Sequence, residues 1–225
     1  MMTKRWLAER RQDKYYRLAK KLDYRSRASF KLMQIDDRFG VLKEGDSVVD
    51  LGASPGGWLQ VAKERVGNGK VIGVDLMPIR PIDGVITIQG DITVKETMDE
   101  LLWKFEGKAD IVLSDMAPNV GGNYSTDHAR SVNLCMFAID VADNILRKNG
   151  KMVIKVFMGD MFWMVKEEMD ARFQSVKIHV PDTTRSASSE VYMIAKGFIG
   201  HEPKQMHGKW TEEKKAEFTV KGELI

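Results

Sequence analysis

A glycine-rich segment and three aspartates follow strand-like runs and could together hold a nucleoside-containing molecule. The segment 50–58 reads DLGASPGGW and joins a predicted strand to a predicted helix, where glycine lets a ligand approach the backbone closely. Asp75 ends the next strand, a position from which a carboxylate can accept hydrogen bonds from ribose hydroxyls. Asp91 and Asp115 follow the third and fourth strands. One such aspartate is typical of a turn or helix cap, but the set predicts a nucleotide-like cofactor.

Lys155 is unusual because it interrupts the apolar run KMVIKVF over residues 151–157. A lysine is rarely buried without a partner, and taken alone Lys155 would be expected to reach solvent. Asp115 is expected at the end of a neighbouring strand, which favours a buried ion pair instead. An amine and a carboxylate held together can orient or deprotonate a hydroxyl group.

Several other chemistries lack their motifs. The glycine spacing matches neither the G-x-G-x-x-G of dinucleotide sites nor the G-K-[ST] of a P-loop. Cys135 is the only cysteine, which excludes an intrachain disulfide and favours a reducing, cytoplasmic setting. The sequence predicts no metal site, because the four histidines are scattered at positions 128, 179, 201 and 207.

Seven strand-like runs alternate with helical patterns and would position these groups. The runs are β-branched, mostly continuous in apolar character and bounded by Gly, Asp or Pro, as in parallel strands buried on both faces. Their order predicts an α/β, Rossmann-like doubly wound domain with helices on both faces of the sheet. The loop 181–189 is too short for a crossover helix, so the last two runs are expected to form an antiparallel pair at the sheet edge. The runs are 47–52, 70–75, 85–89, 109–115, 151–157, 175–180 and 190–198.

Three further segments have helical patterns. Residues 127–147 carry apolar residues at steps of three or four, with Asp127 as a cap and Asn149, followed by glycine, as the end. Residues 25–40 predict a helix before the sheet, and residues 211–218 predict a short C-terminal helix.

We predict a single domain over residues 1–225, with a basic arm and helix in 1–43 and a short tail in 200–225. No apolar stretch approaches the ~20 residues that cross a bilayer, and the N-terminus lacks the apolar core of a secretory signal. The net charge is +3, but residues 1–43 hold 13 Lys/Arg against 5 Asp/Glu. This arm predicts a polyanionic partner, and a solvated basic helix without a partner is the alternative.

Seven motifs run through the chain in a fixed order: RSRASFKL, DLGASPGGW, GVDLMPI, QGDIT, LSDMAPN, KVFMG and SSEVYMIAKGF. In this order they resemble the FtsJ/RrmJ family of RNA ribose 2′-O-methyltransferases over about residues 24–199. The resemblance implies a class I methyltransferase with a seven-stranded, mostly parallel sheet, one antiparallel edge strand and S-adenosyl-L-methionine as cofactor. Ser54 and Met158 stand where Ala and Gln are frequent in the family.

The resemblance also implies which residues bind the cofactor. Gly56 and Trp58 would lie beside its methionine and sulfonium end. Asp75 would hold the ribose hydroxyls and Asp91 the adenine amino group. Asp115 would contact the methionine end near the reacting methyl.

The family's catalytic tetrad of two lysines, an aspartate and a glutamate maps onto Lys31, Asp115, Lys155 and Glu190. The sulfonium already activates the methyl, so the enzyme must mainly align and deprotonate the ribose hydroxyl. We expect Lys155 to be the base or to position the hydroxyl, and Lys31 to steer the phosphate or sugar. Asp115 and Glu190 would orient Lys155 and the ribose. Tyr192 would either stack on the target base or pack beside its strand.

The implied substrate is a uridine of large-subunit ribosomal RNA, acted on by a cytoplasmic monomer. Methylation of tRNA anticodon-loop nucleotides and a non-catalytic RNA-binding assembly factor are alternatives, the second disfavoured by the complete tetrad. A nicotinamide-dependent dehydrogenase would use Asp75 similarly, but this sequence lacks the glycine spacing of such enzymes. RNA phosphates are expected on the basic residues Lys14, Arg17, Lys20, Lys21, Arg25 and Arg27.

Overall fold

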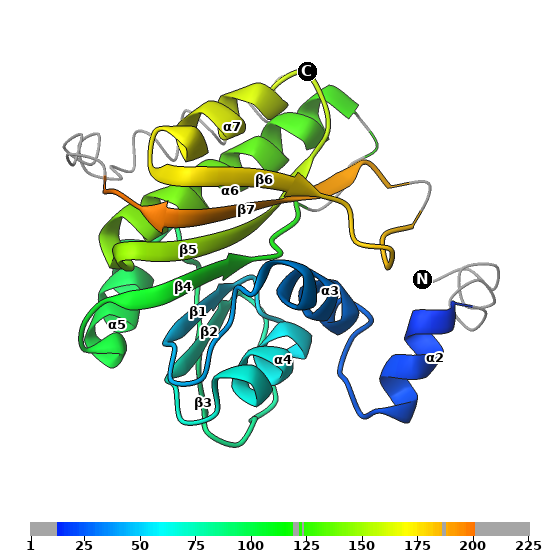
Figure 1. Cartoon of the computed structure of the whole chain (residues 1–225), viewed down its shortest axis with the longest axis vertical. Coiled ribbons are helices and arrows are strands. Elements are labelled where there is room, and N and C mark those ends of the chain that lie inside the picture. Colours follow the sequence, from blue (N-terminus) through cyan, green and yellow to red (C-terminus); the bar gives the residue numbers. More distant parts are fainter. Residues whose placement is uncertain (1–12, 119–121, 123, 186–187, 201–225) are drawn as a thin grey trace.

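A seven-stranded sheet in the order β3-β2-β1-β4-β5-β7-β6 forms the centre of the computed structural model (Figure 1). The structure describes residues 13–118, 122, 124–185 and 188–200. The strands are β1 Val48–Leu51, β2 Val71–Asp75, β3 Val85–Gln89, β4 Ala109–Ser114, β5 Leu146–Phe157, β6 Phe173–His179 and β7 Glu190–Phe198. All neighbouring pairs are parallel except those that β7 makes with β5 and β6. The predicted α/β class with a mostly parallel sheet is confirmed.

The one antiparallel strand, β7, lies inside the edge rather than on it, because it inserts between β5 and β6. Burial explains this order. Almost every residue of β7 is buried or half-buried on both faces, whereas most of β6 is exposed or half-buried. A run that is apolar on both faces belongs in the interior of a sheet, and a run with polar side chains on one face can tolerate an edge.

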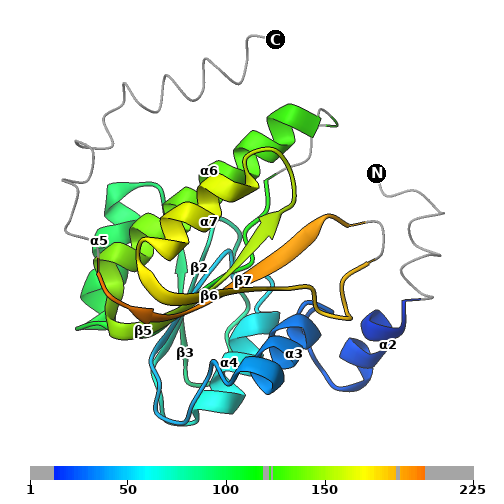
Figure 2. The same ribbon diagram turned by 45° about the horizontal axis from the view of Figure 1, so that its top comes forward.

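Helices cover both faces of the sheet, as predicted. Figures 1 and 2 show α6 and α7 together on one face and α3 and α4 on the other. One apolar cluster packs α5, α6 and α7 against the sheet, and a second cluster packs α3 and α4 against its opposite face. The helices are α2 Lys14–Lys21, α3 Ser29–Phe39, α4 Gly57–Val66, α5 Lys95–Phe105, α6 Tyr124–Ile145 and α7 Phe162–Asp170.

Two predicted boundaries were wrong. The predicted helix 25–40 begins only at Ser29, after a turn that separates it from α2. The predicted helix 127–147 begins at Tyr124, so Asp127 lies in its first turn and is not its cap, and it ends at Ile145, where the chain passes directly into β5. Asn149, with a φ of 64°, therefore lies inside β5, where the pairing with β4 shifts register, instead of ending a helix. The predicted helix 211–218 lies outside the described residues. No helix within the described part is long and apolar enough to cross a membrane.

Candidate active site

The glycine-rich turn between β1 and α4 lies at the carboxyl edge of the sheet. Gly52 has a φ of 74°, and a Cβ there would lie 2.6 Å from Cγ of Met116. Gly56 has a φ of 106° and caps α4. Both positions therefore require glycine. The backbone N–H of Ser54 donates to Oδ2 of Asp75 at 2.8 Å, which joins the turn to the end of β2.

The acidic side chains at this edge have few partners. Asp75 accepts a second hydrogen bond from the backbone N–H of Met77 at 2.7 Å, so both of its partners within the described part of the chain are backbone groups. Asp91 accepts from the N–H and hydroxyl of Thr93 at 2.9 and 2.7 Å, in the turn before α5. A carboxylate has about four acceptor positions, so both can still accept hydrogen bonds from a ligand.

Asp50, on β1, is a site residue that the sequence reasoning missed. Its side chain is fully buried, and neither carboxylate oxygen has a hydrogen-bond partner among the described residues. Burial, and then the charges of Asp115 and Asp75, raise its pKa well above the usual value. The available signal was its position as the first residue of DLGASPGGW, between apolar residues that predict a buried strand.

The structure brings Lys155 and Asp115 together through strand register. Ser114 pairs with Ile154 across β4 and β5, so the residues that follow them are neighbours. Nζ of Lys155 lies 3.2 Å from Oδ1 of Asp115 and donates to its carbonyl oxygen at 2.6 Å. The lysine is 8% exposed, so this is the buried ion pair that the sequence predicts.

A second ion pair joins Lys31 of α3 to Glu190, the first residue of β7. Both side chains are nearly buried, at 11% and 12% exposure. Glu190 also accepts a hydrogen bond from the hydroxyl of Thr184 at 3.1 Å. Each lysine of the predicted tetrad thus faces one of its two acids.

Tyr192 links the two pairs. It lies opposite Lys155 in the β5–β7 register, and its hydroxyl donates to Oδ1 of Asp115 at 2.8 Å. Nζ of Lys31 lies 5.7 Å from the centre of its ring. Burial, with the nearby charges of Asp115 and Glu190, raises the pKa of Tyr192 well above its usual value, so the hydroxyl remains a donor. The ring is fully buried, so of the two predicted alternatives Tyr192 packs beside its strand and does not stack on a base.

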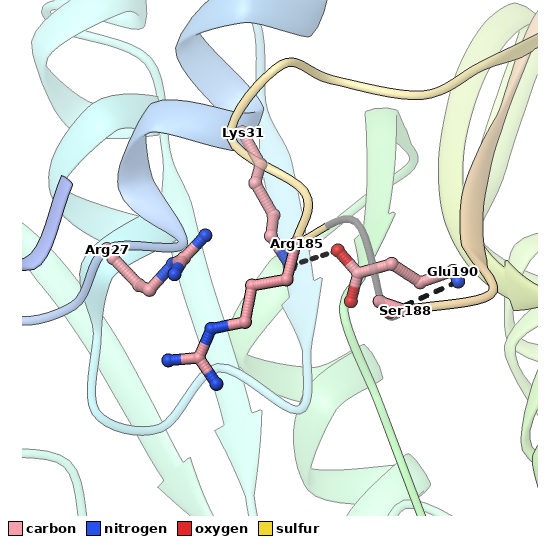
Figure 3. A pocket seen from close by; sticks show the side chains of 5 residues that line it. All are labelled: Arg27, Lys31, Arg185, Ser188 and Glu190. Carbon is pink, nitrogen blue, oxygen red and sulfur yellow. Dashed lines mark hydrogen bonds and ion pairs between the residues drawn. The ribbon is translucent and has the colours of Figure 1, made fainter. Parts of the chain in front are cut away.

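A cavity of about 520 Å³ adjoins the Lys31–Glu190 pair (Figure 3). Arg27 and Arg185 contribute guanidinium groups to it, and both interact with the carboxylate of Asp13. Burial, and then the charge of Arg185, lower the pKa of Arg27. Three cationic side chains against one lining carboxylate make the cavity suitable for an anionic group.

Comparison with known proteins identifies the family to which a chain with these motifs belongs. The model of the FtsJ-like methyltransferase family matches residues 24–198. The chain belongs to this family. A relative from Methanocaldococcus jannaschii, named Ribosomal RNA large subunit methyltransferase E, is 47% identical over 94% of this chain and 86% of its own. A relative of the same name from Methanosarcina mazei is 52% identical over 86% of this chain and 72% of its own.

Solved structures agree with this family assignment. A crystal structure described as a ribosomal RNA methyltransferase from Plasmodium falciparum has a TM-score of 0.71 and 32% identity, covering 79% of this chain and 100% of that chain. A fibrillarin/Nop5p complex has a TM-score of 0.55 at 19% identity, covering 76% and 83%, and supports the fold alone. The predicted enzyme class is confirmed: the chain is an FtsJ-like methyltransferase, whose reaction requires a methyl donor.

Trp58 of this FtsJ-like methyltransferase points into the core. Its side chain is 3% exposed, and its indole N–H donates to the carbonyl oxygen of Ala28 at 2.8 Å. Its ring centre lies 5.8 Å from that of Tyr192. The ring therefore packs α4 against the tetrad, and the predicted contact of Trp58 with the cofactor stays a prediction.

The basic residues of the N-terminal arm fall into two groups. Lys14, Arg17, Lys20 and Lys21 are exposed on α2. The guanidinium of Arg25 instead donates to the carbonyl oxygens of Pro55, Arg80 and Pro81. Arg25 therefore braces the glycine-rich turn, so its predicted contact with an RNA phosphate has no support in this geometry. Residues 1–12 lie outside the described part. No cluster of three metal-ligating side chains occurs within the described residues.

Proposed function

We propose that this methyltransferase transfers the methyl group of S-adenosylmethionine to a ribose 2′-hydroxyl, at a uridine of large-subunit ribosomal RNA. The observation that carries the proposal is the pair of buried ion pairs, Lys155–Asp115 and Lys31–Glu190, linked by Tyr192 beside a basic cavity. Relatives named for large-subunit ribosomal RNA support the choice of RNA. The predicted cytoplasmic location, monomeric state and single-domain boundaries stay predictions.

The acidic edge of the sheet fits a cationic cofactor. Among the described residues the buried Asp50 has no hydrogen-bond partner, and the charges of Asp115 and Asp75 raise its pKa. Lys155 neutralises only one of these three acids, so a further cation would stabilise the group. S-adenosylmethionine carries an ammonium and a sulfonium group, and when bound it supplies an electrophilic methyl. The turn that contains Gly52 and Gly56 lets the protein backbone come close to a ligand at the same edge.

We assign a group of the protein to each part of the proposed cofactor. Asp75 would accept hydrogen bonds from the ribose hydroxyls, and Asp91 from the adenine amino group. Asp115 would hold the methionine end, with Gly56 and the backbone of Trp58 beside it. Leu76 and Met77, which follow Asp75, are exposed and offer apolar surface to a purine.

In this proposal Lys155 acts on the ribose hydroxyl. Its Nζ has two acceptors from Asp115, the carbonyl oxygen and Oδ1, which fix the direction of the amine. As an ammonium, this group can orient a ribose hydroxyl for in-line attack on the methyl, and only after losing its own proton can it accept the proton of that hydroxyl. Lys31 and Glu190 would hold the sugar from the other side, while Arg27 and Arg185 bind the adjoining phosphate.

The proposal is tested by incubating the purified protein with radiolabelled S-adenosylmethionine and, separately, large ribosomal subunits, free large-subunit RNA and tRNA. We expect label in large-subunit RNA, resistant to alkaline cleavage at one uridine, because a 2′-O-methyl group blocks cleavage of its own phosphodiester. Lys155→Met serves as the inactive control. Label in tRNA alone would favour the anticodon-loop alternative, and no label in any RNA would contradict the proposed reaction.

A further inference from the structure

A second cavity, of about 280 Å³, opens at the ends of β4 and β5. It is lined mainly by apolar and aromatic side chains, and none of these side chains has a role in the reaction proposed above. Its lining includes Pro118, Tyr124, His128, Phe157, Met158 and Ser189.

This cavity borders the Lys155–Asp115 ion pair. Phe157 lies two residues after Lys155 on the same face of β5, and Nζ of Lys155 is 5.9 Å from the centre of its ring. Ser188 lines the basic cavity and Ser189 the apolar one, immediately before Glu190. The tetrad therefore stands between a cationic cavity and an apolar cavity. A nucleotide with its ribose at Lys155 could place its phosphate in the first and its base in the second.

Tyr124 gives the apolar cavity a fixed aromatic surface. Its ring is stacked on that of His128, with 5.9 Å between centres and 5° between planes. Its hydroxyl donates to the carbonyl oxygen of Met158 at 3.5 Å. Tyr124 nevertheless remains 63% exposed, and Met158 is 44% exposed. An exposed, oriented aromatic ring beside a reactive centre is the feature on which nucleobases stack.

His128 holds that surface in place. Its Nε2 accepts a hydrogen bond from the backbone N–H of Met161 at 3.1 Å, and a Cβ at Gly159 would lie 2.5 Å from its ring. The remaining ring nitrogen, Nδ1, is buried and has no hydrogen-bond partner among the described residues. A polar edge of a ligand would satisfy this group, as would a bound water.

We propose that this cavity holds the base of the nucleotide that is methylated, stacked on Tyr124 while its ribose lies at Lys155. The inference rests on the proposed function and deepens it. Tyr192 cannot take this role because it is fully buried. A phosphate is disfavoured here because the lining is apolar and Asp127 contributes a carboxylate, whereas the cavity of Arg27 and Arg185 attracts one.

The first test compares Tyr124→Ala and Tyr124→Phe with the wild type, using the RNA in which wild-type methylation has been mapped. We expect Tyr124→Ala to lower kcat/KM for RNA by roughly 10- to 100-fold, the range expected for loss of one stacking contact. Tyr124→Phe should stay within about threefold, because the ring is retained. Trp103→Ala, which removes an even more exposed aromatic ring on α5, is the control. The Kd of S-adenosylmethionine, measured calorimetrically, should be unchanged in all three.

The second test uses a short RNA with an abasic ribose at the mapped position. On this substrate Tyr124→Ala should cost no more than about twofold relative to wild type, because the ring has lost its partner. An equal loss on both substrates, or full activity of Tyr124→Ala on the natural RNA, would overturn the base site while leaving the methyltransfer proposal intact. Absence of wild-type methyl transfer to any RNA would instead reject the proposed function. Met158→Glu, at an exposed position, offers an independent check: it should lower activity only on the RNA that carries the base.

Discussion

The carboxyl edge of the sheet has two halves, which differ in whether their acidic side chains have cationic partners. Among the described residues at the ends of β1 and β2, Asp50 has no hydrogen-bond partner and Asp75 is bonded only to backbone N–H groups. Beyond β4, Asp115 and Glu190 each face a lysine. In the first half, a cationic ligand would supply the positive charge that these acids lack. The second half neutralises its own charges and fixes the direction of its lysines, as chemistry on an uncharged hydroxyl requires.

The largest expected effect comes from breaking the second half at Lys155. Lys155→Met should lower kcat by roughly 10³-fold, within the range for losing a general acid–base group, while the Kd of S-adenosylmethionine changes by less than about threefold. Stopped assays with saturating RNA and calorimetric binding would measure these two quantities. Lys151→Met is a matched control, because Lys151 is a mostly buried lysine of the same strand, paired with Asp46 outside the tetrad. Turnover of Lys155→Met near the wild-type rate would remove Lys155 from the mechanism.

A substitution in the first half, at the end of β2, should weaken cofactor binding and leave RNA binding unchanged. Asp75→Asn is expected to raise the Kd of S-adenosylmethionine about 10- to 100-fold, the value of hydrogen bonds to a charged acceptor. RNA affinity, measured by filter binding without cofactor, should be unchanged, and kcat at saturating cofactor should fall little. Asp99→Asn, at an exposed acid on α5, controls for the loss of one negative charge. A parallel loss of RNA affinity would show that the two halves are not separate.

Asp50 gives the acidic half a pH dependence. Burial and the neighbouring charges of Asp115 and Asp75 raise its pKa in the folded protein. The stability that its proton provides is therefore complete below the unfolded-chain pKa of about 3.9 and is lost as pH rises through the folded pKa. One such group lowers the free energy of unfolding by at most about 1.4 kcal/mol per pH unit in that window.

Urea unfolding of the cofactor-free protein would detect this effect. The difference in unfolding free energy between Asp50→Asn and wild type should grow in favour of the variant as pH rises from about 4 upward. Parallel stability curves across the whole range would mean that Asp50 is compensated in the folded protein. S-adenosylmethionine should then stabilise the wild type more than the variant at neutral pH, because it supplies the missing positive charge.

Local patterns were sufficient to predict most of the sheet. β3 and β7 occupy the predicted residues, because continuous β-branched runs bounded by turn residues have few other solutions. The α6–β5 junction was mispredicted because Asn149 and Gly150 also suit a bulge, and only pairing with β4 decides between the two. The order β5-β7-β6 likewise depends on which run can be buried on both faces.

Some residues of the candidate site could likewise be predicted from the sequence, and others could not. Lys155 and Asp115 could be paired from sequence because they lie in two predicted strands, 151–157 and 109–115, that were expected to be neighbours. Tyr192 was ambiguous because neighbouring residues of a strand point to opposite faces, and its burial depends on α3 and Trp58, which lie far away in sequence. Asp50 gave no sign of lacking a partner, since a missing hydrogen bond is visible only when every neighbour is placed.

The smallest expected effect concerns how strongly the cationic cavity attracts RNA. Arg185 is 57% exposed and pairs with Asp13 at 3.5 Å, so it can turn toward a phosphate at little cost. Arg185→Ala should raise KM for RNA about threefold and reduce the slope of log KM against log salt by about 0.7, the value for one phosphate contact on a single strand. Arg147→Ala is the control, because Arg147 is similarly exposed and paired with Asp110. A salt slope unchanged by Arg185→Ala would place the phosphate elsewhere, and the contrast between the two halves would then rest on the tetrad alone.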